Sequence, residues 1–271
     1  MLTEANDFRD ECDTLSTLLT DASPETFETI TQFKSWSIDD IFAHLHLWNY
    51  AADLTLQSPE KFHEFFAWVM KRMSTGDTHQ KLQRAWFDER EDGLNGPALF
   101  DAWREFYPKL AARYRDASPQ TRVAWAGPEM SAGAKIIARQ METWSHSQGI
   151  FDCLGKTRKE ADRVKNIADL GVRTYGWTFR NRGETPPQPK PFIQLTAPSG
   201  TVWEWNEVQS DNFVRGDAVE FSQVVTQTRN IADTKLDVLG KNAIAWMAVA
   251  QCFAGNPETP PAQGFRRRWE K

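Results

Sequence analysis

Apolar residues recur every three or four positions through most of the first 155 residues, a spacing typical of helices that bury one face. This pattern predicts helices over 4–21, 41–54, 58–73, 97–117 and 131–154, with a shorter one around 80–87. Pro108 is expected to kink or break the helix that contains it, because proline cannot donate the helical hydrogen bond. The first part of the chain is therefore predicted to be an all-α bundle of four principal helices with insertions.

The pattern changes after about residue 158, where short alternating segments appear. Residues 192–196 and 201–205 alternate on either side of a Pro/Gly turn, which predicts a β-hairpin. The other elements expected in this part are a helix over 160–179, a strand over 213–216, and helices over 218–227 and 241–253. The predicted fold is a helical bundle over residues 1–157 followed by a smaller α+β domain over 158–271.

Composition places the chain among ordinary globular proteins and excludes several classes of partner. Of its 271 residues 40% are hydrophobic and 25% are charged, with a net charge of -5 and no long basic run, so no nucleic-acid partner is expected. No signal peptide is recognisable, and the longest apolar run, 243–250, is too short to span a bilayer. The three cysteines lie far apart without CxxC spacing, which favours a reducing, cytoplasmic environment.

Two residues near the end of the bundle indicate a metal site. Glu142 and His146 are four positions apart, so on a helix both project from one face, about one turn from each other. A carboxylate oxygen beside an imidazole nitrogen suits zinc or another divalent first-row metal. Such pairs also occur on solvated helix faces, so the hypothesis needs a ligand from another helix.

The upstream helix offers His44 and His46 as that ligand. Two residues apart on a helix, they point roughly 200° apart, so only one can face the bundle seam. His44 shares its side with the apolar Ile41 and Trp48, and we predict that His44 is the ligand. Three protein ligands with one open position are typical of catalytic zinc sites. The alternative is a buried histidine bonded to a carbonyl group.

These residues resemble a known family. Trp36-Ser37-x-x-Asp40 followed by His44-Leu45, and then Glu142-x-Trp144-x-His146, are similar to the metal-binding motifs of the mycothiol-dependent maleylpyruvate isomerase group, within the DinB-like bundle superfamily. The closer match is to an uncharacterised metal-binding subfamily of that group. The resemblance covers about residues 36–255, and 58–95 is its least matched stretch.

The resemblance implies a DinB-like bundle whose zinc, or other divalent metal, is bound by His44, Glu142 and His146. It also implies a low-molecular-weight thiol cosubstrate such as mycothiol, bacillithiol or glutathione. The family often has His-Gly-Gln-Asp where this chain has His146-Ser147-Gln148-Gly149. The carboxylate missing at Gly149 removes a contact to a metal ligand or to the substrate.

The function that follows is activation of a thiol for addition to an electrophilic small molecule, ending in isomerisation or S-transfer. An anionic substrate would need cationic partners. Arg139 on the metal helix, and Arg173, Arg180 and Arg229 near the domain junction, are the candidates. The chain is expected to work as a monomer or homodimer, without nucleic acid or membrane.

Two other classes stay open. A metal-dependent hydrolase could use the same site, although Glu142 is already needed as a ligand and no second carboxylate is obviously placed as a general base. A non-catalytic binding protein could instead present the tryptophans of the hairpin, Trp203 and Trp205, to a ligand or partner.

Overall fold

The computed structural model describes residues 1–125 and 129–267 of the chain. The chain separates into two compact units, Met1–Cys153 and Leu154–Lys271. The boundary lies four residues before the one expected from the sequence. Among the described helices, none combines the length and the apolar character needed to cross a membrane.

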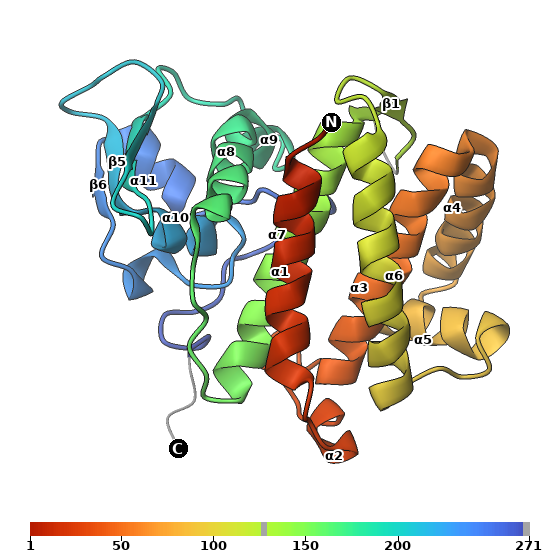
Figure 1. Cartoon of the computed structure of the whole chain (residues 1–271). Helices are drawn as coiled ribbons and strands as arrows, with labels where there is room; N and C mark the ends of the chain where they lie inside the picture. Colours follow the sequence, from red (N-terminus) through yellow and green to blue (C-terminus); the bar gives the residue numbers. More distant parts are fainter. Residues whose placement is uncertain (126–128, 268–271) are drawn as a thin grey trace. The chain divides into compact units, whose positions relative to one another are not determined.

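The first unit is built on a four-helix bundle, as predicted (Figure 1). Its helices are α1 (Glu4–Leu19), α3 (Ile38–Gln57), α6 (Gly96–Asp116) and α7 (Ala132–Cys153). Helix α1 packs against α6 and α7, and α3 packs against the same two helices. Their apolar faces meet in a core that includes the fully buried rings of Phe8, Phe42, Trp103 and Trp144.

Smaller elements surround this bundle. Helices α4 (Pro59–Ser74) and α5 (His79–Arg90) pack against each other and against α3. The short helix α2 (Pro24–Phe27) and the two-residue strands β1 (Arg122–Val123) and β2 (Met130–Ser131) were not predicted. Elements of two to four residues are too short to show a period, so sequence pattern cannot detect them.

Pro108 does not break its helix, and the expected interruption is wrong: α6 runs from Gly96 to Asp116 with Pro108 inside it. Pro108 lies on the exposed face of α6. The carbonyl group that proline leaves without a helical partner can therefore turn toward water, so the missing hydrogen bond destabilises only the turn around Pro108 and does not end the helix.

The second unit contains a four-stranded sheet in the order β4-β3-β5-β6. Its strands are β3 (Phe192–Thr196), β4 (Val202–Trp205), β5 (Phe213–Asp217) and β6 (Asp237–Leu239). Strands β3 and β4 form the predicted hairpin, with Ile193 opposite Trp205, while β5 lies parallel to β3. Strand β6, which was not predicted, pairs antiparallel with β5 at the edge of the sheet.

The helices of the second unit are shorter than predicted. The expected helix over 160–179 is three elements: the 3₁₀ turn Asp162–Val164, α8 (Lys165–Arg173) and α9 (Tyr175–Arg180). Thr174 separates the last two as the C-terminal cap of α8: its backbone N–H and its hydroxyl both donate to the Leu170 carbonyl, and the hydroxyl also contacts the Gly171 carbonyl. Helix α10 (Ala218–Val225) packs on α8, β3 and β5, and α11 (Lys241–Met247) ends six residues before the predicted limit.

Gly171 marks a close approach of α8 to α10, and replacing it tests this packing. A Cβ atom at Gly171 would lie 2.8 Å from Cγ2 of Val225 and 3.1 Å from Cε1 of Phe221. Gly171→Ala should therefore lower the free energy of unfolding by about 1–3 kcal/mol, measured by urea denaturation.

The matched control is Gly149→Ala, also inside a helix, where a Cβ atom would meet Thr31 at an ordinary 3.7 Å. It should leave stability unchanged or raise it by up to about 1 kcal/mol, since alanine is the better helix former. Equal losses in both variants would contradict the packing argument.

Candidate metal centre

A capping box fixes the start of α3 and with it the position of His44. The hydroxyl of Ser37 accepts a hydrogen bond from the backbone N–H of Asp40, and the Asp40 carboxylate accepts one from the N–H of Ser37, both at 3.0 Å. This reciprocal pair satisfies two backbone donors at the helix start. His44 follows Asp40 by four residues and so lies one turn further along the same face.

The predicted ligands meet between α3 and α7. Nε2 of His44 lies 3.0 Å from Oε2 of Glu142, and Nε2 of His146 lies 3.2 Å from the same oxygen. One ligand atom from each residue lies within 4.8 Å of the other two. The side chains of His44, Glu142 and His146 are 14%, 23% and 9% exposed, so the cluster is largely shielded from solvent.

The charge state of this cluster suits a cation. Burial raises the pKa of Glu142, but the hydrogen bonds and charges of His146 and His44 outweigh burial and hold it well below its ordinary value. Burial, followed by the charge of His146, lowers the pKa of His44 to about 3. At neutral pH the site therefore offers an ionised carboxylate and a neutral His44 ring, which are the forms that bind metals.

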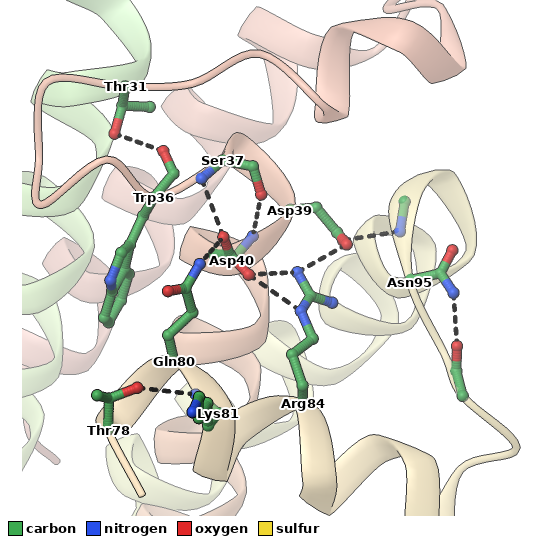
Figure 2. A network of polar contacts seen from close by, with 12 residues as sticks. Thr31, Trp36, Ser37, Asp39, Asp40, Thr78, Gln80, Lys81, Arg84 and Asn95 are labelled. Carbon is green, nitrogen blue, oxygen red and sulfur yellow. Dashed lines mark hydrogen bonds and ion pairs between the residues drawn. The ribbon is translucent and has the colours of Figure 1, made fainter.

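Aromatic rings hold His146 in place. The loop before α3 folds back on itself, where the Thr31 hydroxyl donates to the Trp36 carbonyl over 2.9 Å (Figure 2). This loop stacks the Trp36 ring on His146, with 6.1 Å between ring centroids, and sets the Phe33 ring edge-on at 4.7 Å. The two rings restrict the plane of the imidazole, whose Nε2 lies beside the Glu142 carboxylate.

His44 is held by a polar contact from α5. Its Nδ1 atom lies 2.7 Å from Nε2 of Gln83, a fully buried side chain. His46, the other candidate, lies against the rings of Phe87 and Phe106 instead, and burial lowers its pKa to about 4. His44 and His46 therefore point to different sides of α3, as their spacing on a helix predicts, and His44 is the one that faces Glu142.

The candidate arginines have different surroundings. Arg139 was expected at the mouth of the site, but its side chain is 3% exposed and donates to Oδ1 of Asn49 and to the Leu45 carbonyl. Arg173 and Arg180 are exposed residues of the second unit, and Arg229 there donates to the Thr228 carbonyl. The roles of Arg139, Arg173 and Arg229 at the site remain predictions.

The tryptophans proposed as a binding surface are partly engaged within their own unit. Nε1 of Trp205 donates to Oδ1 of Asp169 over 2.6 Å, and the Trp203 and Trp205 rings meet edge to face. The ammonium group of Lys165 lies 5.3 Å from the Trp205 ring centroid. The hairpin therefore has a packing role on α8.

Sequence reasoning missed two buried polar residues near the cluster. Gln83 carries no signal in the sequence, because only the docking of α5 on α3 brings it to His44. The position of Lys135 could have been predicted from helix periodicity, because it precedes Glu142 by seven residues and so lies two turns away on the same face of α7. Lys135 is 1% exposed, lies over the Trp125 ring, and has no hydrogen-bond partner among residues 1–125 and 129–267.

Comparisons with known proteins agree with this architecture. Residues 8–151 match the family model of the mycothiol maleylpyruvate isomerase N-terminal domain. An uncharacterized protein of Mycobacterium tuberculosis, found in two strains, is 31% identical over 261 residues, covering 95% of this chain and 96% of the relative.

Two solved structures share the fold. The mycothiol-dependent maleylpyruvate isomerase superposes with a TM-score of 0.50 at 16% identity, over 82% of this chain and 86% of that one. A histidine-to-alanine variant of that enzyme gives a TM-score of 0.51 at 15% identity, with the same coverage. At these identities the likeness establishes the fold.

The buried amine of Lys135 should cost stability, and its removal tests this. Burial, with a smaller effect of the Arg139 charge, lowers the pKa of Lys135 to about 5. Between that pKa and the ordinary lysine value the unfolded chain binds a proton that the folded chain does not, so stability falls as pH falls across this range. Lys135→Met should raise the free energy of unfolding at pH 7 by about 1–3 kcal/mol.

The gain should be larger at pH 6 than at pH 9, as measured by urea denaturation at each pH. Lys109→Met, at an exposed position of α6, is the control and should change neither the stability nor its pH dependence. A Lys135→Met variant less stable than the parent at both pH values would show that the amine has a stabilising role.

Proposed function

Because the chain belongs to the family of the mycothiol maleylpyruvate isomerase N-terminal domain, we propose that it is a metal- and thiol-dependent enzyme. In this proposal His44, Glu142 and His146 hold zinc or another divalent metal. A low-molecular-weight thiol, mycothiol first among the candidates, is the cosubstrate. The reaction is addition of that thiol to an electrophilic small molecule, ending in isomerisation or S-transfer.

The convergence of both histidines on one oxygen of Glu142 is the observation that carries the proposal. Two imidazole nitrogens and a carboxylate oxygen within 4.8 Å form a donor set that suits a divalent first-row metal. Three protein ligands leave a position for a further reactant. A bound divalent metal would supply Lewis acidity, lowering the pKa of a thiol or water molecule beside it.

Cys12 and Cys153, the two cysteines of the helical unit, are poor sources of a reactive thiolate. Burial raises the pKa of Cys12 well above its ordinary value and raises that of Cys153 to about 12. Thiolate is the nucleophilic form, so neither residue is activated near neutral pH. These two cysteines therefore do not replace an added thiol in the proposed reaction, which agrees with a thiol cosubstrate.

The residues around the proposed ligands surround them with aromatic rings and supply a positive charge. The rings of Trp36, Phe33 and Trp48 line the two histidines and keep water from their flanks. The guanidinium of Arg139, hydrogen bonded to two neutral oxygens, contributes a positive charge from one turn before Glu142. In this proposal that charge favours an anionic substrate, with Arg173 and Arg229 as further candidates for its carboxylate.

At Gly149 this chain differs from the sequence that the family often has. Gly149 lies on the same face of α7 as His146, where a Cβ atom would contact Thr31 and Phe33 at ordinary distances. The position has room for a side chain, but this chain supplies none. The carboxylate that the family often has there is missing in this protein, so the contact that it would make, to a metal ligand or to the substrate, is missing too.

A hydrolase is the second candidate and is less favoured. It would need a general base beside the metal, and Glu142 is engaged by both histidines. The nearby carboxylate of Asp40 is engaged by Arg84, Gln80 and the start of α3. A non-catalytic binding protein remains the third candidate.

Metal content is the first test of the proposal. Purified wild-type protein should contain about one divalent metal per chain by elemental analysis, with zinc expected. His44→Ala and His146→Ala should each lose it, because two ligands hold such an ion too weakly to survive purification.

His46→Ala is the matched control, since that ring packs on Phe87 and Phe106 and should leave the metal content unchanged. Wild-type protein that takes up no metal, even after reconstitution, would exclude both enzyme candidates and favour the binding protein.

Thiol dependence separates the enzyme classes. With maleylpyruvate as the first substrate, we expect turnover in the presence of mycothiol and none without a thiol. The His44→Ala variant should lose more than about a hundredfold in kcat/KM, since even residues that only contact a ligand can cost that much. The assay is the absorbance change on isomerisation, repeated with glutathione and with other unsaturated electrophiles. Thiol-independent release of a hydrolysis product would instead support the hydrolase.

A further inference from the structure

His44 has a polar neighbour at each ring nitrogen. Nε2 faces the carboxylate of Glu142 at 3.0 Å, and Nδ1 faces the side-chain amide of Gln83 at 2.7 Å. A neutral imidazole carries its proton on only one nitrogen and accepts at the other. Gln83 is fully buried, so its amide, and not water, determines which tautomer His44 adopts.

The amide of Gln83 is suited to both tautomers. Its N–H group can donate to an unprotonated Nδ1, which leaves the proton on Nε2, directed at Glu142. Its oxygen, Oε1, is buried and has no hydrogen-bond partner within the described part of the chain. A half-turn of the amide exchanges the two atoms, so that Oε1 accepts from Nδ1–H and the lone pair of Nε2 becomes free.

The docking of α5 on α3 explains why Gln83 reaches this position. Arg84 binds Oδ1 of Asp40 through Nε and Nη2, at 3.0 and 2.9 Å, and also binds Asp39 at 2.7 Å (Figure 2). Gln80 donates to Oδ2 of Asp40 over 2.6 Å. Positions 80, 83 and 84 share one face of α5, so these contacts at the start of α3 set the register that aligns Gln83 with His44.

We propose that Gln83 is a positioning residue of the metal centre, which holds His44 in the tautomer with its proton on Nδ1 and its Nε2 lone pair free for the metal. This inference rests on the proposed metal site. Metal-binding histidines commonly donate their second ring N–H to a fixed acceptor, and losing that acceptor typically weakens metal affinity 10- to 100-fold. Here the acceptor comes from outside the four-helix bundle, on α5.

Three variants test the role of Gln83. Gln83→Leu keeps a similar volume and removes both polar atoms, so zinc affinity, measured by competition with a chelator, should fall about 10- to 100-fold. Gln83→Glu keeps an acceptor for Nδ1–H and should bind zinc as tightly as wild type or more tightly. Gln80→Leu tests the docking of α5 separately: it removes one hydrogen bond between α5 and α3 but no contact to His44. Because Arg84 still binds Asp39 and Asp40, zinc affinity should change less than about threefold in this variant.

A second readout reports the tautomer itself. Two-bond nitrogen–proton couplings in the zinc-loaded protein should place the His44 proton on Nδ1 in wild type and Gln83→Glu. The same proton should exchange with solvent faster in Gln83→Leu, because it has lost its acceptor. Thermal denaturation of each zinc-free variant separates this effect from loss of folding.

The outcomes are distinct. Zinc binding by wild type and Gln83→Leu with equal affinity would overturn the role of Gln83 while leaving the metal centre intact. Equal weakening in Gln80→Leu and Gln83→Leu, without rescue in Gln83→Glu, would show that α5 acts only through its docking. Absence of zinc binding in wild type would overturn the metal centre itself, and this inference with it.

Discussion

The shielded carboxylate of Glu142 is the constraint on which the polar interior of the bundle depends. Moving a carboxylate from water into protein costs several kcal/mol unless hydrogen bonds and opposite charges compensate. Here His146 compensates from the same helix and His44 from α3, 98 positions away in the sequence. A shift of α3 along α7 would separate the carboxylate from His44, so this contact specifies the register of the two helices as well as the site.

The two histidines are positioned by different means, and both involve segments outside the bundle. His146 is oriented by ring packing against the loop before α3, whereas His44 is oriented by Gln83 on α5. The carboxylate of Asp40 connects these supports, because it caps the start of α3 and also receives Arg84 and Gln80 from α5. A single local motif therefore starts the helix that carries His44 and anchors the helix whose Gln83 contacts His44.

Helix periodicity accounts for what could be predicted from the sequence. It located the four principal helices, and at 100° per residue it distinguished His44 from His46 and put Glu142 and His146 on one face. What it could not predict depends on packing between segments. Gln83 reaches His44 only because α5 docks in one register, and the break at Thr174 falls inside a stretch that the apolar spacing predicts as one helix. The burial of Arg139 depends likewise on Asn49, a residue of another helix.

Charge balance gives a physical reason to expect anionic reactants at this site. In the proposed site one carboxylate and two imidazoles, which bind metals in their neutral form, would carry a single negative charge and would leave a divalent cation with one positive charge uncompensated. The guanidinium of Arg139, bonded only to neutral oxygens in the contacts described here, adds another. In a shielded site an uncompensated charge is costly, so binding of anions is favoured. A thiolate and a substrate carboxylate would together balance the two positive charges, whereas a neutral substrate attacked by hydroxide would leave one of them unpaired.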